Sequence, residues 1–84
     1  MKVTIYGAGY VGLVTGACLS EVGNDVLCVD VNEDRVAALN RGEIPIYEPG
    51  LSKIITRNCE SGHLRFTTHT AEAVAHGILQ IVAV

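Results

Sequence analysis

Residues 7–12 form a glycine-rich hexapeptide, Gly-Ala-Gly-Tyr-Val-Gly, with the spacing GxGxxG. Residues 3–6 before it are β-rich, and from Tyr10 onward the sequence follows a helical pattern. The spacing alone is weak support for a ligand site. Placed directly between a strand and a helix, it is typical of the turn that holds a dinucleotide. A glycine-rich turn without a ligand is the alternative interpretation.

Each glycine of this turn has a distinct expected role. Gly7 allows a sharp bend at the end of the strand, and Gly9 lacks a Cβ, so a pyrophosphate can approach the backbone closely. Gly12 allows the helix to pack close to the strand. The backbone amides of Tyr10 and Val11 are expected to face the phosphates, because the start of a helix offers unpaired N–H groups and the positive end of its dipole.

An acidic residue follows the second predicted strand at the distance that a dinucleotide site requires. Asp30 lies 18 residues after Gly12, close to the expected separation of about 20 residues. Its carboxylate can accept hydrogen bonds from both ribose hydroxyls and would repel a 2′-phosphate, which favours NAD over NADP. Arg35, in the first turn of the next helix, could flank the cofactor or could be a solvated helix residue.

The rest of the chain alternates between strand and helix patterns. Strands are expected at residues 3–6, 25–30, 64–67 and 78–84, and helices at residues 10–22, 33–41, 49–61 and 71–76. Asn32 and Thr70 are expected to cap the second and fourth helices, and Pro49 is expected to be the first residue of the third. The buried face of the first helix is predicted to carry Val11, Val14, Thr15, Cys18, Leu19 and Val22. This alternation predicts an α/β, Rossmann-type parallel sheet of strand order 3-2-1-4 with flanking helices.

Composition and charge exclude several classes of protein. The chain is 49% hydrophobic, which is too apolar for a disordered segment, yet its apolar runs are shorter than the roughly 20 residues of a membrane span. The net charge of −3 argues against nucleic-acid or anionic-membrane partners. The 84 residues end within an apolar strand, so we expect a truncated Rossmann domain that further strands would complete.

The remaining chemistry-bearing residues have plainer interpretations. Three cysteines without a CxxC pair indicate free thiols in a reducing cytoplasm and no metal site, with Cys18 and Cys28 buried. The three histidines are expected at the surface or in loops. Glu48 is expected to be a helix-start acid and Tyr47 to pack on its loop.

Three segments together resemble the UDP-glucose/GDP-mannose dehydrogenase family. They are the turn with its helix start (residues 7–14), Val-Asp-Val-Asn at residues 29–32 with Arg35, and Pro-Ile-Tyr-Glu-Pro-Gly-Leu at residues 45–51. The third is the most specific, and its Tyr47 resembles the UDP-glucose branch. The resemblance runs over essentially all 84 residues.

The resemblance implies an activity, a cofactor and a set of contacts. Members of this family oxidise the C6 alcohol of a nucleotide sugar to a carboxylate in two NAD-linked steps, through a thioester on a cysteine. The implied cofactor-binding residues are Gly7, Ala8, Gly9, Tyr10, Val11, Gly12, Asp30 and Arg35. The family's cysteine, lysine and asparagine motifs are not found here. Residues 1–84 are therefore expected to be the N-terminal part of an NAD-binding domain with no catalytic residue, from a homo-oligomeric enzyme that uses a UDP-sugar.

Two other functions stay open. A non-catalytic NAD-sensing Rossmann module of a transport regulator would also combine GxGxxG with an acid after the second strand. It would not be expected to carry the loop at residues 45–51. A dehydrogenase acting on another substrate, such as a hydroxy acid or an acyl thioester, is the third possibility, because the same sheet supports many functions.

Overall fold

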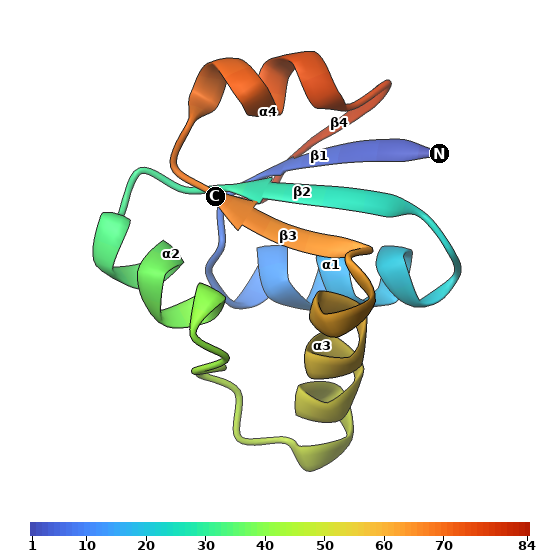
Figure 1. The fold of residues 1–84 in the computed structure, drawn as a ribbon, viewed down its shortest axis with the longest axis vertical. Coiled ribbons are helices and arrows are strands. Elements are labelled where there is room, and N and C mark those ends of the chain that lie inside the picture. Colours follow the sequence, from blue (N-terminus) through green and yellow to red (C-terminus); the bar gives the residue numbers. More distant parts are fainter.

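Four short parallel strands form the centre of the computed structural model, which describes residues 1–84 (Figure 1). The strands are β1 (Lys2–Tyr6), β2 (Asp25–Val29), β3 (Leu64–Thr67) and β4 (Leu79–Val82). The helices are α1 (Tyr10–Glu21), α2 (Glu33–Asn40), α3 (Pro49–Ser61) and α4 (Thr70–His76). The predicted alternation is confirmed, although β4 is shorter than the expected segment at residues 78–84.

The order of the strands is β3-β2-β1-β4, as predicted. All three pairings are parallel, and the register places Ile5 beside Cys28 of β2 and Ile81 of β4. All four strands therefore end at the same edge of the sheet. In Figure 1, α1 and α3 cover one face of the sheet and α4 covers the other, while α2 lies near the edge where the strands end.

The main core fills the space between the sheet and the helices α1 and α3. Its members include Ile5, Leu13, Cys28, Ile55 and Leu64, each at most 1% exposed. A smaller cluster of Leu27, Val29 and Ala73 lies under α4. The buried Thr4 hydroxyl donates to the Ala73 carbonyl over 2.6 Å and ties that helix to β1.

The buried face of α1 differs from the predicted one. Val11, Cys18 and Val22 are exposed, and the residues that pack inward are Gly12, Leu13, Gly16, Ala17 and Ser20. The prediction was wrong because it followed the large apolar side chains. Small residues instead let this helix lie close to the sheet, which large side chains would prevent.

Two of the three predicted helix starts are confirmed. The Asn32 side chain caps α2 by accepting a bond from the Arg35 amide over 3.0 Å, and Pro49 is the first residue of α3. Thr70 was wrong as a cap, because it is already the first helical residue and His69 holds the cap position. The chain is instead fixed there by the Thr67 hydroxyl, which accepts from the His69 amide.

The loop between α2 and α3 is held by its acid and not by its aromatic residue. Glu48 caps α3, accepting bonds from the amides of Gly50 and Leu51 at 2.8 and 2.7 Å, as expected for a helix-start acid. Ile46 is buried and anchors the loop. Tyr47 is 99% exposed, so the prediction that it packs on the loop was wrong.

Candidate functional site

The bend after β1 is built on Gly7. Its φ of +117° is a conformation that side chains disfavour, and its amide donates to the Val29 carbonyl over 2.8 Å. A Cβ on Gly7 would lie 2.6 Å from the Ala83 carbonyl oxygen. The bend is therefore enclosed by β2 on one side and by the end of β4 on the other.

The other two glycines of the turn have opposite surroundings. A Cβ on Gly12 would lie 1.8 Å from the Gly7 carbonyl oxygen, so the start of α1 packs directly against the bend. A Cβ on Gly9 would meet nothing within 4 Å. The backbone at Gly9 therefore faces open space, where an incoming group could approach it closely.

The first turn of α1 points at this open space without a side-chain cap. Gly9 occupies the cap position, and no side chain accepts a hydrogen bond from the first amides of the helix. The first turn also contains no acidic residue that would offset the positive end of the dipole. Tyr10 and Val11 are both exposed at its rim. Such a helix start is suited to an anionic group.

Asp30 lies directly after β2 and faces the glycine turn. Its Oδ2 accepts a bond from the Ala8 amide over 2.9 Å, and its Oδ1 accepts one from the Asn32 amide over 2.9 Å. Burial alone would raise the pKa of Asp30, but the hydrogen bonds from Asn32, Ala8 and Arg35 together with the Arg35 charge hold it below its usual value. The carboxylate is therefore ionised at neutral pH, and Oδ1, which accepts only the Asn32 bond, keeps acceptor capacity.

Arg35 completes this group from the first turn of α2. Its Nη1 lies 3.1 Å from Oδ2 of Asp30, in an ion pair whose arginine side chain is 45% exposed. The guanidinium has further N–H donors that this single contact does not use. Arg35 therefore lies beside Asp30 and the glycine turn, and its contact with a cofactor stays a prediction.

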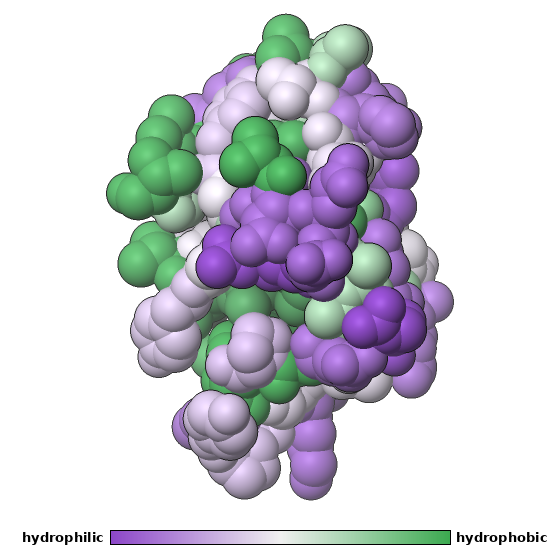
Figure 2. Space-filling model, turned by 90° about the vertical axis from the view of Figure 1, so that its left-hand side faces the viewer, coloured by the Kyte–Doolittle hydropathy of each residue, from purple (hydrophilic) through white to green (hydrophobic).

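All eight predicted residues lie at the edge where the strands end, and all of them except Ala8 and Gly12 line one of two adjoining cavities. One, of about 470 Å³, lies between the glycine turn, Asp30 and Arg35. The other, of about 260 Å³, lies between Gly7, Asp30 and the start of α4. Figure 2 faces this edge and shows several exposed hydrophobic groups beside a hydrophilic central band.

Several lining residues were missed by sequence reasoning. Ala83 and Val84 lie beside the turn, while Tyr6, Val31 and Thr70 line the smaller cavity. For Ala83 and Val84, the predicted strand order was the only indication of this position, because β4 pairs with β1 and its end therefore lies beside Gly7. No local pattern marks the others.

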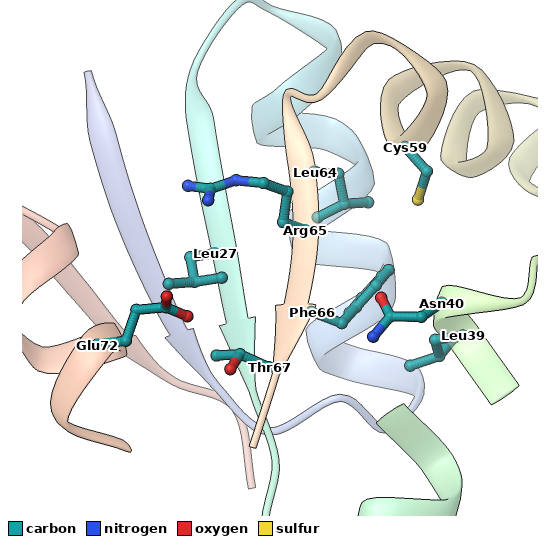
Figure 3. A pocket seen from close by; sticks show the side chains of 9 residues that line it. All are labelled: Leu27, Leu39, Asn40, Cys59, Leu64, Arg65, Phe66, Thr67 and Glu72. Carbon is teal, nitrogen blue, oxygen red and sulfur yellow. The ribbon is translucent and has the colours of Figure 1, made fainter. Parts of the chain in front are cut away.

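A further pocket, of about 350 Å³, opens at the free edge of β3 (Figure 3). Leu64, Phe66 and Cys59 lie on one side of this strand, and Arg65 and Glu72 lie on the other. None of the eight predicted residues lines this pocket. It is therefore separate from the glycine turn.

The histidines and cysteines do not form a second site. The His76 side chain is buried, contrary to the surface position expected, and it pairs with the Asp25 carbonyl at 3.0 Å. Cys28 is buried as expected, whereas Cys18 is exposed. No group of three His, Cys, Asp or Glu side chains is placed to hold a metal ion.

None of the helices combines the length and apolar character that crossing a bilayer demands.

The residues of the turn fit a dinucleotide. Open backbone at Gly9 leaves room for a diphosphate, and the uncapped start of α1 supplies amide donors toward it. An ionised carboxylate lies directly after β2, where a Rossmann domain requires an acceptor for the ribose hydroxyls. The two adjoining cavities meet at Gly7 and Asp30, as a ligand with two linked halves requires.

Comparison with known proteins agrees with this geometry. Residues 1–84 match the model of the UDP-glucose/GDP-mannose dehydrogenase family, NAD binding domain. The UDP-glucose 6-dehydrogenase of Rhizobium meliloti (strain 1021) is 49% identical over all 84 residues, which are 19% of that protein. Among solved structures, a ternary complex of GDP-mannose dehydrogenase from Pseudomonas aeruginosa matches the whole chain with a TM-score of 0.91 at 37% identity. A UDP-glucose dehydrogenase from Pyrobaculum islandicum matches 98% of the chain with a TM-score of 0.87 at 38% identity.

The coverage of these matches shows how large a part of the similar proteins the chain corresponds to. The chain covers 19% of the length of each of the two solved chains, so it spans about a fifth of the proteins that it resembles. The structural matches cover the α/β unit with its glycine turn. They include proteins named for a UDP-sugar and for a GDP-sugar.

Proposed function

The chain belongs to the UDP-glucose/GDP-mannose dehydrogenase family, and from this premise we propose that residues 1–84 are the N-terminal part of its NAD-binding Rossmann domain. The cofactor of that domain is NAD. The activity we propose for the complete enzyme is the two-step, NAD-linked oxidation of UDP-glucose at C6 to UDP-glucuronate. The 49% identity to a UDP-glucose 6-dehydrogenase supports UDP-glucose as the sugar nucleotide.

The proposed binding residues are Gly7, Ala8, Gly9, Tyr10, Val11, Gly12, Asp30 and Arg35. In the proposal, the amides at the start of α1 hold the diphosphate, and Gly9 lets it reach the backbone. Asp30 accepts bonds from the adenosine ribose, while Arg35 keeps the carboxylate in place and flanks the nucleotide. Bound NAD supplies the hydride acceptor, and the residues of this chain bind and orient it.

The catalytic residues of the complete enzyme lie outside this proposal. We propose that residues 1–84 supply no catalytic side chain, because the residues of this site are assigned to the cofactor. We also propose a cytoplasmic location and a homo-oligomeric complete enzyme. Nothing in the comparisons supports the alternative of a transport regulator.

One observation supports the proposal most directly. The ionised Asp30 carboxylate, held by hydrogen bonds from the Ala8 and Asn32 amides, faces the open glycine turn at the start of α1, which has no side-chain cap. Its test is calorimetric titration of the complete enzyme that contains this chain with NAD and with NADP. We expect Asp30→Ala to weaken NAD binding by at least about tenfold, because hydrogen bonds to a charged group are lost. The preference for NAD over NADP should shrink as well, because the negative charge that repels a 2′-phosphate is gone.

Glu33→Ala is the matched control for this test. Glu33 is an exposed acid of the first turn of α2, three residues from Asp30, so its loss changes the net charge equally. We expect Glu33→Ala to bind NAD like the unchanged chain. If Asp30→Ala leaves NAD affinity unaltered, or if both variants weaken it equally, the ribose role of Asp30 is wrong.

A further inference from the structure

The peptide group between Gly7 and Ala8 is held at both of its ends, by one residue of β2 and by one that directly follows this strand. The thiol of Cys28 lies 3.5 Å from the Gly7 carbonyl oxygen. The Ala8 amide, on the other end of the same peptide group, donates to Asp30 over 2.9 Å. Cys28 and Asp30 are two residues apart, so an extended strand presents them on the same face.

The Cys28 thiol is protonated, as a hydrogen bond to the Gly7 carbonyl requires. Burial, with a smaller effect of the Asp30 charge, raises the pKa of Cys28 to about 12, so the group keeps its proton at neutral pH. A protonated thiol is a weak donor, and the 3.5 Å separation from the carbonyl oxygen suits the larger sulfur atom. The side chain is fully buried, so water does not compete for the contact.

Packing from α1 also restricts the same carbonyl. A Cβ on Gly12 would lie 1.8 Å from the Gly7 oxygen, so this oxygen lies against both the start of the helix and Cys28. A flip of the peptide would exchange its carbonyl and amide, and the Asp30 carboxylate would then face an oxygen. The surroundings therefore select one orientation of this peptide.

We propose that Cys28 is a positioning residue for the diphosphate turn, which with Asp30 fixes the orientation of the Gly7–Ala8 peptide. The inference rests on the proposed function, because it assigns a task to that turn. It gives Asp30 a second role, since the carboxylate proposed for the ribose also holds the turn. It distinguishes Cys28 from an ordinary core side chain.

The test is amide hydrogen exchange at Ala8, measured by NMR on the chain without NAD. We expect Cys28→Ala to speed exchange at Ala8 by about fivefold, the size expected from one weak hydrogen bond. Cys28→Ser keeps a donor and should restore slow exchange. NAD affinity, measured by calorimetry, should fall by a similar factor in Cys28→Ala and recover in Cys28→Ser.

Val26→Ala is the control for simple loss of packing. Val26 is fully buried on the same face of β2, two residues before Cys28 and farther from the turn. We expect Val26→Ala to lower stability while exchange at Ala8 and NAD affinity stay as in the unchanged chain. The inference is overturned if Cys28→Ala leaves exchange at Ala8 unaltered, or if Val26→Ala speeds it equally.

Two further results separate the possible failures. If the complete enzyme with the unchanged chain does not bind NAD, the proposed function fails, while exchange at Ala8 still decides whether the peptide is held. If Cys28→Ala does not fold, the infrared S–H band of Cys28 decides, recorded after Cys18→Ser and Cys59→Ala remove the other thiols. A band shifted as for a hydrogen-bonded thiol supports the inference, and the band of a free thiol overturns it.

Discussion

The three glycines of the turn have separable roles at the scale of single residues. Gly7 takes a backbone conformation that other residues disfavour, Gly12 lies against the Gly7 carbonyl, and Gly9 faces open space. The sequence predicted these roles because each follows from the missing Cβ at a fixed place in a strand–turn–helix unit. Only the structure shows which of them the fold itself depends on.

Alanine substitutions at Gly9 and Gly12 should therefore have different effects. Gly9 has φ −77° and ψ −165°, which alanine adopts freely, so we expect Gly9→Ala to change the free energy of unfolding by less than about 1 kcal/mol. NAD affinity should nevertheless fall by about tenfold or more, because the added methyl group occupies the space of the diphosphate. Chemical denaturation and calorimetric NAD titration measure the two quantities.

Gly12→Ala serves as the contrasting variant. Its methyl group would meet backbone at 1.8 Å, so we expect a loss of stability of about 1–3 kcal/mol or more. A Gly9→Ala chain that binds NAD as tightly as the unchanged chain would refute the role of Gly9. Equal losses of stability in the two variants would refute the separation of the two roles.

At the scale of helices and strands, local patterns predicted the existence of every element but not every buried face. Val11, Cys18 and Val22 matched a helical apolar face, yet α1 packs through its glycine and alanine side. Apolar periodicity does not reveal that a strand will approach a helix closely enough to exclude large side chains. The glycines at positions 12 and 16 were the available signal for that close approach.

The cap of α3 offers a prediction at the same scale. Glu48 accepts bonds from two otherwise unpaired amides, so we expect Glu48→Ala to lower the free energy of unfolding by about 1 kcal/mol. Tyr47→Ala is the control, because its side chain is almost fully exposed and should change stability by less than about 0.5 kcal/mol. Chemical denaturation of both variants checks this, and equal effects would argue against the cap.

At the scale of the whole molecule, the candidate site exists only because distant segments meet at one edge of the sheet. The predicted strand order placed the turn and Asp30 correctly, since both belong to the contiguous unit of β1, α1 and β2. Ala83 and Val84 join the site from the far end of the chain, and Thr70 joins from the start of α4. Side-chain positions at such meeting points depend on packing between elements, which local patterns do not describe.

Within residues 1–84, β4 is an edge strand that pairs with β1 on one side only, which leads to a prediction about association. Leu79 and Val82 of this strand are exposed, and so are Ile78 and Val84, which flank it. An unpaired apolar edge strand is a template for pairing with another chain. For residues 1–84 taken alone, we therefore expect association that increases with protein concentration, measured by analytical ultracentrifugation. We expect Val82→Lys to reduce it because a charge on an edge opposes such pairing.

Val22→Lys tests whether this effect belongs to the edge. Val22 is exposed at the end of α1, away from β4, and the substitution changes the net charge of −3 by the same single unit. If repulsion between whole molecules governed association, both variants would reduce it equally. If β4 is the contact, only Val82→Lys does so, because only there does the new charge lie where a second strand would pair.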